Sequence, residues 1–487
     1  MFAGVRTRHA GVRAPRMSRF LAIDLGAETG RAILGTLDRG RLTLEELHRF
    51  PNTPVRLATG LYWDTLRLFH EIRQALLICG RERKLELDGI GIDTWGVDFG
   101  LLGSDGALVD NPRHYRDSRT SGMIEKTLAV VPREEIFAET GIQFMPLNTL
   151  YQLHAMRLSG SPALHSATRL LFMPDLFNYW LTGEMRAEVS IASTSQFYNP
   201  IKKQWSGGLF RRLDLPERIL PEMVLPGTRL GTLLPEIAES SGLSCGVPVY
   251  ATACHDTASA VAAVPAEGDG WCYISSGTWS LMGVELNAPV INEQSLEANF
   301  TNEVGAGNKI RFLKNIAGLW LLQECRRAWA MEGREYSYEE LSKLAGAAPS
   351  EGALIDPDAF PEPGRMPERI ADYCRSRGCQ TPNQPGGMTR LILESLAATY
   401  RKVLDNLETL LGRPIDRVHI VGGGSRNRLL NQLAANATGR TVIAGPAEAT
   451  AAGNILVQAI GAGDVSGLAE ARQIVERSFA LEIYQPE

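Results

Sequence analysis

The sequence predicts a mixed α/β protein built from two related halves, and two observations lead to this prediction. Short apolar strand patterns alternate with helical patterns along most of the 487 residues, as is typical of sheets covered by helices. The strand–turn–strand pattern of residues 20–37 also returns at residues 272–284. Such a recurrence favours two halves of similar design.

In the first half, residues 20–25 and 32–37 are apolar runs joined by the glycine-containing turn 26–31, which predicts a hairpin. Apolar residues at helical spacing predict a helix over 64–79. The remaining predicted elements are two strands within 89–102, a helical stretch over 147–182 with a break near Gly160, a loop-rich stretch over 184–240, a strand over 247–254 and a helix over 258–264.

The Pro/Gly stretch 265–270 is the natural boundary between the halves. The second half opens with the hairpin 272–284 and closes with alternating helices and strands. The predicted elements after this hairpin are a helix over 387–411, a strand over 417–421, a helix over 426–437, a strand over 441–444 and a helix over 447–461.

Composition and charge exclude several classes of protein. The chain is 44% hydrophobic and 22% charged, as in ordinary globular proteins. Its net charge of −5 gives no basic field for nucleic acid or an anionic membrane. No apolar run approaches the ~18 residues of a membrane helix. We therefore expect a soluble, cytoplasmic protein with no nucleic-acid or membrane partner.

The first 19 residues carry five arginines and no acid. Such a start is compatible with a transit peptide, but Met17 directly precedes the first strand pattern, so an over-long translation start is favoured. The seven cysteines include no C-x-x-C pair and no zinc spacing. Reduced thiols are expected, although Cys374 and Cys379 are near enough in the sequence for a local bridge.

Glycine turns are the candidate phosphate sites, because the sequence has neither a P-loop nor a dinucleotide-binding fingerprint. Residues 422–424 are three glycines between a strand and a helix, where a backbone can approach an anion. The alternative is a tight connection with Ser425 as the helix N-cap. Asp24 beside the turn 26–31 could face a metal–phosphate group, and residues 275–278 are similar; a plain hairpin is the alternative for both.

Asp256 follows a strand and precedes a helix. It is either a helix N-cap or a carboxylate at the ligand-binding end of an α/β sheet. Asp93 and Asp98 flank Gly96 and are either turn residues or acceptors for sugar hydroxyls. Trp95 and Trp279 could stack on a sugar or fill the core.

Taken in order, these segments resemble the FGGY group of sugar kinases over nearly all of residues 20–462. A single motif would be weak evidence for the resemblance, whereas the whole set in this order is specific. The motifs that carry the resemblance are 24–27 (DLGA), 91–99 (GIDTWGVDF), 115–120 (YRDSRT), 255–260 (HDTASA), 275–283 (SSGTWSLMG), 313–316 (LKNI), 318–323 (GLWLLQ) and 419–424 (HIVGGG).

The resemblance implies two actin-like (ribonuclease-H-like) α/β domains around a central catalytic cleft, in which ATP, Mg²⁺ and a ketose meet. It implies that Asp256 is the catalytic base and that Asp24 lies near the magnesium. The implied sugar-binding residues are Gly96, His255, Asp256, Thr257 and Asn315. The implied nucleotide-binding residues are Ala27, Glu28, Thr29, Gly30, Arg31, Thr278, Gln323 and Gly423.

These residue types suit phosphoryl transfer, which needs charge neutralisation and a base for the attacking hydroxyl. Glu28 departs from the family's usual small hydroxyl residues, so we expect it to point away from the triphosphate or to pair with Arg31. The resemblance implies phosphorylation of a ketose, with L-rhamnulose favoured over L-fuculose and D-xylulose. An actin-like ATP switch and a sugar-binding module without catalysis are the alternatives.

The resemblance also divides the chain. The predicted parts are an Arg-rich extension (1–17), an N-terminal domain with the sugar site, first phosphate loop and base (18–264), a C-terminal domain with the nucleotide site (265–462) and a C-terminal tail (463–487). A monomer or a dimer is expected.

Overall fold

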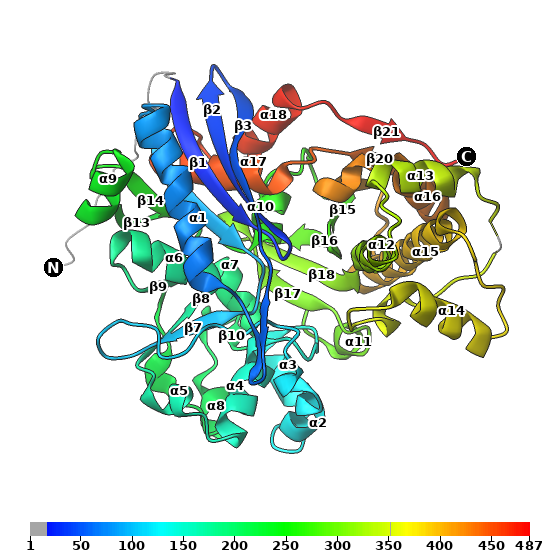
Figure 1. Ribbon diagram of the computed structural model, residues 1–487, viewed down its shortest axis with the longest axis horizontal. Helices are drawn as coiled ribbons and strands as arrows, with labels where there is room; N and C mark the ends of the chain where they lie inside the picture. Colours follow the sequence, from blue (N-terminus) through cyan, green and yellow to red (C-terminus); the bar gives the residue numbers. More distant parts are fainter. Residues whose placement is uncertain (1–16, 351) are drawn as a thin grey trace.

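The computed structural model describes residues 17–350 and 352–487, and the expected Arg-rich extension lies almost wholly outside them. Two lobes, each built on a mixed sheet, make up the molecule (Figure 1). The first sheet contains, in spatial order, β13 (Thr228–Thr232), β14 (Pro248–Ala251), β6 (Gly89–Thr94), β1 (Ser18–Leu25), β2 (Thr29–Asp38) and β3 (Arg41–Pro51). The second contains β17 (Thr301–Val304), β18 (Ile310–Ala317), β16 (Trp279–Leu286), β15 (Trp271–Ser276), β19 (Arg417–Val421), β20 (Thr441–Ala444) and β21 (Glu482–Tyr484).

Six strands of the second sheet repeat the order of the six strands of the first, and β17 is an additional edge strand. This confirms the predicted α/β class with two similar halves. In the first sheet, β3, β2 and β1 are antiparallel neighbours, and β6 and β14 continue the sheet in parallel with β1. In the second, β18, β16 and β15 are antiparallel neighbours, and β19 and β20 continue in parallel with β15. An antiparallel strand then follows in each sheet, β13 and β21. The carboxyl ends of β1, β6 and β14 therefore lie at one edge, as do those of β15, β19 and β20.

Two helices pass between the sheets. The first is α10 (Asp256–Ala262) and the second is α17 (Ala449–Ala462), which packs against β1 and β2 of the first sheet although it lies near the end of the chain (Figure 1). Their backbones approach closely because Gly453 has no side chain: a Cβ there would lie 1.7 Å from the carbonyl oxygen of Ser259. A helix from each half thus joins the lobes.

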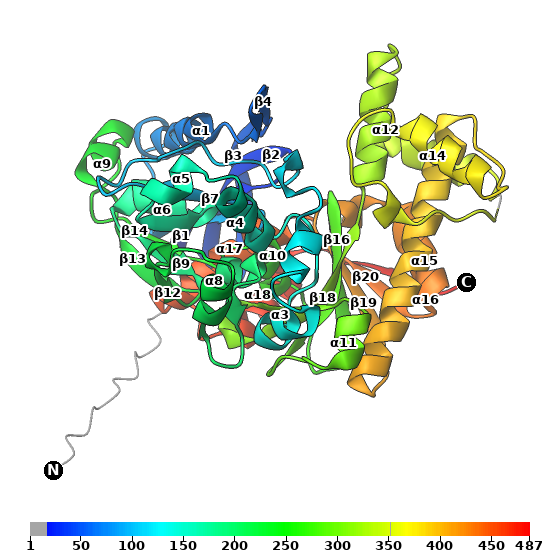
Figure 2. The same ribbon diagram turned by 90° about the horizontal axis from the view of Figure 1, so that it is seen from below.

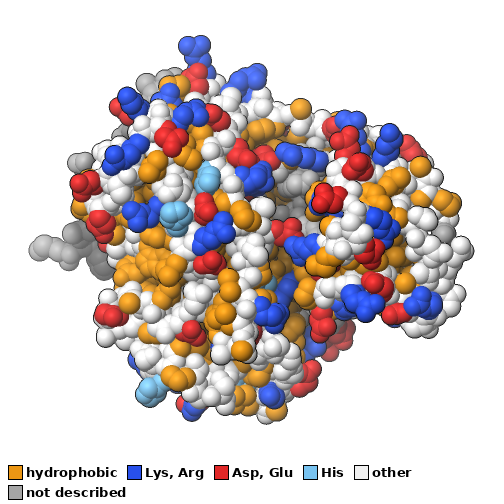
Figure 3. All heavy atoms as spheres, viewed as in Figure 1, with side chains coloured by type: hydrophobic (Ala, Val, Ile, Leu, Met, Phe, Trp, Pro, Cys, Tyr) orange, Lys and Arg blue, Asp and Glu red, His pale blue; other side chains and the backbone are white. Residues whose placement is uncertain are grey.

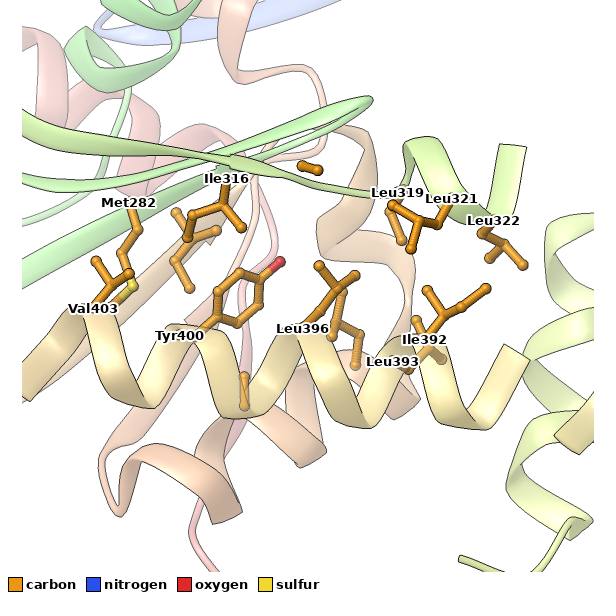
Figure 4. Close-up of a cluster of buried hydrophobic side chains, with 14 of the residues drawn as sticks. Met282, Ile316, Leu319, Leu321, Leu322, Ile392, Leu393, Leu396, Tyr400 and Val403 are labelled. Carbon is orange, nitrogen blue, oxygen red and sulfur yellow. The ribbon is translucent and has the colours of Figure 1, made fainter. Parts of the chain in front are cut away.

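The core of the second lobe is covered by a long helix, α15 (Pro385–Leu411). Its apolar face places Leu396, Tyr400 and Val403 against Met282 and Ile316 of the sheet (Figure 4). Toward its N-terminus, it packs on the first turns of α12 (Trp320–Met331), which projects from the lobe (Figure 2).

The helical prediction over 147–182 is wrong in one segment. Helices α4 (Thr149–Leu158), α5 (Pro162–Ser166) and α6 (Met173–Thr182) are interrupted by strand β8 (Arg169–Phe172), which pairs with β7 (Phe99–Leu102). The three apolar residues of β8, Leu170, Leu171 and Phe172, run directly into a helix without a turn signal, so the hydrophobic pattern does not separate the strand from the helix.

The remaining elements are peripheral to the sheets. They are β4 (Val55–Leu57), β5 (Gly60–Tyr62), α1 (Thr65–Leu77), α2 (Met123–Leu128), α3 (Arg133–Thr140), β9 (Arg186–Glu188), α7 (Val189–Ala192), β10 (Tyr198–Asn199), β11 (Gln204–Trp205), α8 (Gly207–Arg212), β12 (Glu222–Val224), α9 (Pro235–Ser241), α11 (Glu293–Glu297), α13 (Tyr338–Ala347), α14 (Met366–Ser376), α16 (Arg428–Thr438) and α18 (Leu468–Ser478). The expected tail 463–487 consists of α18 and β21. Within the described ranges, no helix combines the length and apolarity needed to cross a bilayer.

Candidate active site

A cleft of about 1320 Å³ lies between the lobes. Its mouth is the hollow visible between the two parts of the surface in Figure 3, with Lys, Arg, Asp and Glu side chains on the rim. Residues from both sheets line it at the ends of β1, β6, β15, β18 and β19 and at the start of α10. Open α/β sheets place their ligands at such strand ends.

Most of the expected site residues come together in this cleft. Those that line it are Ala27, Glu28, Thr29, Arg31, Gly96, His255, Asp256, Thr257, Thr278, Asn315, Gln323 and Gly423. Gly30 and Asp24 do not. A Cβ at Gly30 would lie 2.2 Å from the ring of Phe50, so this glycine is needed for core packing, and Asp24 is 4% exposed.

Asp24 at the end of β1 is covered by Arg31 of the neighbouring strand. The guanidinium of Arg31 forms ion pairs with Asp24 on one side and with Glu448, which precedes α17, on the other. Glu448 also accepts a hydrogen bond of 2.8 Å from Arg426. Burial raises the pKa of Asp24, and Arg31 opposes this rise. Arg31 therefore braces the first turn against the second half of the chain.

Three aspartates gather beneath the turn. Asp93 at the end of β6 is fully buried, and it accepts a hydrogen bond from the amide of Asn454 through Oδ2, while its Oδ1 has no hydrogen-bond partner. Burial, followed by repulsion from Asp24, raises the pKa of Asp93 well above its usual value, and Asp256 adds a smaller repulsion. Among the described residues, no three His, Cys, Asp or Glu side chains form a metal-ligating group. A cation held here would be bound by few protein ligands.

Of the two arrangements expected for Glu28, the pairing with Arg31 is wrong. Its carboxylate forms an ion pair with Arg327 of α12, across the mouth of the cleft. Arg31 is already occupied by two other carboxylates, and Arg327 is the cation that faces the turn. The charge of Glu28 is thereby balanced by a residue of the other lobe.

The glycines 422–424 let the end of β19 pack against the second candidate phosphate turn, residues 275–278. Gly422 has φ +82°, and a Cβ at Gly424 would lie 2.0 Å from Ser276 Oγ, so both glycines let β19 end against the turn of β15 and β16. Gly423 has open space where its Cβ would be, which leaves backbone exposed to the cleft. Ser425 is not the N-cap of the next helix: Asn427 accepts from the amide of Leu430 at the start of α16.

Asp256 is the first residue of α10, and His255, not Asp256, occupies the N-cap position. The backbone before it is fixed, because Glu188 accepts from the amide of Cys254 (3.0 Å) and Ser190 Oγ accepts from that of His255 (3.2 Å). The side chain of Asp256 is 31% exposed. Its Oδ1 accepts from Thr257 Oγ1 at 3.0 Å, so the carboxylate stands at the cleft with a defined orientation.

The aromatic wall of the site is held by Asp98. One oxygen of Asp98 accepts from the indole nitrogens of Trp63 (2.6 Å) and Trp95 (3.0 Å), and the other accepts from Gln152 (2.9 Å). Asp98 is thus a structural residue and not an acceptor for sugar hydroxyls. Trp95 is 5% exposed and still lines the cleft, as does Trp279.

Asn315 is fixed from the opposite lobe. Gln143 Oε1 accepts from the backbone nitrogen of Asn315 at 2.9 Å and from its side-chain amide at 3.1 Å. No motif of the sequence points to Gln143. Sequence patterns also do not indicate Glu448, or Glu303 and Arg311, which lie behind His255, because these residues reach the site only through the tertiary fold.

Two models of one protein family match the chain. The "FGGY family of carbohydrate kinases, N-terminal domain" matches residues 19–263. The C-terminal domain of the same family matches residues 272–462.

Curated relatives extend along nearly the whole chain. The rhamnulokinase of Bacteroides thetaiotaomicron is 46% identical and covers 96% of this chain and 96% of the relative. The rhamnulokinase of Enterococcus faecalis is 41% identical, covering 96% and 94%. That of Oceanobacillus iheyensis is 38% identical, covering 95% and 97%.

Solved structures share the fold. Gluconate kinase from Lactobacillus acidophilus has a TM-score of 0.80 at 14% identity, covering 97% of this chain and 94% of that one. Plasmodium falciparum glycerol kinase with ADP has a TM-score of 0.77 at 14% identity, with the same coverage. At such identities the likeness concerns the fold alone.

Proposed function

The chain belongs to the FGGY family of carbohydrate kinases, and from this premise we propose that it transfers the γ-phosphoryl group of ATP to the 1-hydroxyl of L-rhamnulose. Similarity to rhamnulokinases at 38–46% identity supports the choice of sugar. One observation carries the mechanism: the carboxylate of Asp256 stands in the cleft that is lined by both glycine turns.

Asp256 acts as the general base. Its carboxylate accepts the proton of the primary hydroxyl while the hydroxyl oxygen attacks the γ-phosphorus of ATP. The bond between the γ-phosphorus and the oxygen that bridges it to the β-phosphate then breaks, and ADP leaves. A carboxylate within about 2.6–3.2 Å of the hydroxyl is sufficient for this step. The contact from Thr257 holds Oδ1 in place, which supports a preoriented base.

The phosphates bind between the two turns. Ala27 and Thr29 of the first lobe and Thr278 and Gly423 of the second line the same cleft. Turns and glycines offer backbone N–H groups to phosphate oxygens. Phosphoryl transfer depends mainly on this positioning and on charge neutralisation, so the two lobes together hold the reacting group.

The acidic residues fit a magnesium ion that accompanies ATP. Oδ1 of Asp93 is buried without a partner, and Asp24 lies on the adjacent strand. Mg²⁺ is usually held by one or two carboxylates together with substrate phosphates, so Asp24 and Asp93 would hold it. When bound, the ion would neutralise charge on the phosphates. Asp24 remains paired with Arg31 in the described structure.

The sugar binds against Trp95 and Gly96, with Asn315 as its polar contact and His255 beside it. Gln143 fixes Asn315 from the other lobe, so the sugar site is complete only when the lobes are together. Closure of this kind excludes water and limits hydrolysis of ATP without sugar. We further propose that the protein acts in the cytoplasm as a monomer or a dimer, without nucleic acid or membrane as a partner.

The test is ADP release with Mg²⁺-ATP and L-rhamnulose, L-fuculose, D-xylulose or no sugar. We expect strong dependence on L-rhamnulose. Preference for another ketose would retain the mechanism and change the substrate, whereas equal ADP release without sugar would indicate an actin-like ATPase and refute the kinase.

The base is tested with Asp256→Asn, which preserves the shape of the side chain and removes its charge. We expect turnover to fall at least about 100-fold with unchanged circular dichroism. Near-normal turnover in this variant would exclude Asp256 as the base.

A further inference from the structure

A buried charged cluster lies behind the proposed base. Arg311 on β18 has no exposed surface, Glu303 on β17 is 4% exposed and His255 is 7% exposed. Charges in the interior are costly unless they are paired and hydrogen-bonded. The reaction described above uses neither Arg311 nor Glu303, so the role of this pair needs a separate account.

The guanidinium of Arg311 determines which nitrogen of His255 carries the proton. Its Nη2 lies 3.0 Å from His255 Nδ1, and its Nε and Nη2 both donate to the carbonyl oxygen of Val304 at 3.2 and 3.1 Å. Arginine has donors only and stays protonated. The partner of Nη2 at His255 must therefore be a lone pair on Nδ1, which leaves the proton of the neutral imidazole on Nε2.

Glu303 balances the charge of Arg311. Its Oε2 lies 3.1 Å from Arg311 Nη2 and 3.3 Å from His255 Nδ1. Burial alone would raise the pKa of Glu303, but the charge of Arg311 holds it below its usual value. Glu303 is therefore an anion, and Arg311 is not left as a lone buried cation.

The other side of the imidazole faces the base. His255 Nε2 lies 3.5 Å from Asp256 Oδ1. Thr257 donates to the same oxygen at 3.0 Å. Among the described contacts, both fall on Oδ1, so Oδ2 is the oxygen that remains open to a substrate hydroxyl.

We propose that Arg311 and Glu303 are positioning residues for Asp256: Arg311 fixes His255 as the Nε2–H tautomer, and that N–H group directs the carboxylate of Asp256 toward the substrate. The proposal rests on the proposed function, in which Asp256 is the base. Glu303 and Arg311 belong to the second sheet, whereas His255 and Asp256 belong to the first lobe. The second lobe thus orients the base of the first.

The kinetic test removes the pair as a unit, because loss of one partner would leave an unpaired buried charge. In the double variant Glu303→Gln/Arg311→Met, we expect kcat to fall about 10- to 100-fold, since a small misplacement of a reacting group has an effect of this size. The KM for ATP should change less than about twofold. The single variant Arg311→Lys retains a donor toward Nδ1, so its kcat should lie between those of the double variant and the wild type.

A matched control is available beside the same sheet. Arg472 of α18 and Glu285 of β16 form a partly buried ion pair, with side chains 13% and 6% exposed. Because neither residue lines the cleft, Glu285→Gln/Arg472→Met should leave kcat within about twofold. A general effect of lost buried charges would instead lower kcat in both double variants and would overturn the positioning role.

The tautomer can be measured without any destabilising variant. In ¹⁵N-histidine NMR spectra of the full chain, with His255→Asn used for assignment, Nδ1 of His255 should be unprotonated and Nε2 protonated. A proton on Nδ1 would overturn the proposal even if the double variant failed to fold. Turnover by Asp256→Asn would refute the proposed base. An inactive Asp256→Asn with a fully active, folded Glu303→Gln/Arg311→Met would refute the positioning role alone.

Discussion

The crossing of α10 and α17 at Gly453 gives the most direct test of how the lobes are joined. A methyl group at this position would lie 1.7 Å from the carbonyl oxygen of Ser259 and 2.6 Å from its carbonyl carbon. Backbone atoms cannot rotate away as a flexible side chain can. The substitution Gly453→Ala therefore requires the two helices to separate by roughly 1.5 Å before an ordinary contact is restored.

This separation has a structural and a catalytic consequence. The apolar cluster shared by the two helices includes Val261 and Ile455, and overpacking of such a core costs typically 1–3 kcal/mol. Because the clash is with backbone, we expect a loss of about 3 kcal/mol. Ser259 lies one turn after Asp256 on α10, so the proposed base moves as well, and a displacement of about 1 Å can lower the rate about 100-fold.

The assay compares Gly453→Ala with Gly346→Ala. Gly346 lies in α13 with open space around the position of a Cβ, so alanine there should stabilise the helix by up to about 1 kcal/mol. Urea unfolding should show opposite shifts of the midpoint in the two variants, and ADP release should fall only in Gly453→Ala. Equal midpoints in Gly453→Ala and the wild type would refute the close approach of the helices.

Two further predictions concern the first lobe. The guanidinium of Arg116 lies 4.0 Å from the ring centre of Trp320 in the other lobe. Removal of this cation–π contact in Arg116→Ala should raise the KM for sugar about 2- to 30-fold, and Arg116→Lys should give an intermediate KM. An unchanged KM would contradict a role of this contact in holding the lobes together. Burial raises the pKa of Glu188 from 4.5 to about 7, so between these pH values the folded protein binds a proton that the unfolded chain has released. The contribution of Glu188 to stability should then fall as pH rises through this window. Urea midpoints between pH 5 and 8 should decline less steeply in Glu188→Gln, and identical slopes would show that Glu188 does not titrate there.

Strands bounded by glycine could be predicted closely from the sequence. The predicted strands over 417–421 and 441–444 have the same bounds as β19 and β20, because each is a short apolar run that ends at a glycine. Strand β8 has no glycine at its boundary, and its residues were predicted as part of a helix. Local signals therefore locate an element only where a turn residue separates it from the next one.

The candidate site divides in the same way. The placement of the glycine turns and Asp256 at the cleft could be predicted because their residues lie in short motifs. Arg31 and Glu448 are 417 positions apart, and in a strand a buried charge such as Arg311 has the same sequence pattern as an exposed one. Contacts of this kind depend on the tertiary fold, and no periodicity reveals them.

The similar strand order of the two sheets places a carboxylate near the start of one helix in each half, and the two carboxylates differ in their surroundings. After β14 the chain leads into α10 through Asp256, and after β20 it leads into α17 through Glu448, so each half places a carboxylate at the corresponding helix start. Glu448 is paired with two arginines, Arg31 and Arg426. In the described part of the chain, Asp256 is paired with no arginine or lysine and contacts His255 and Thr257. A carboxylate held by two guanidinium groups is a poor proton acceptor, so Glu448 is a brace between the lobes, whereas Asp256 is the carboxylate available for the proposed role of base.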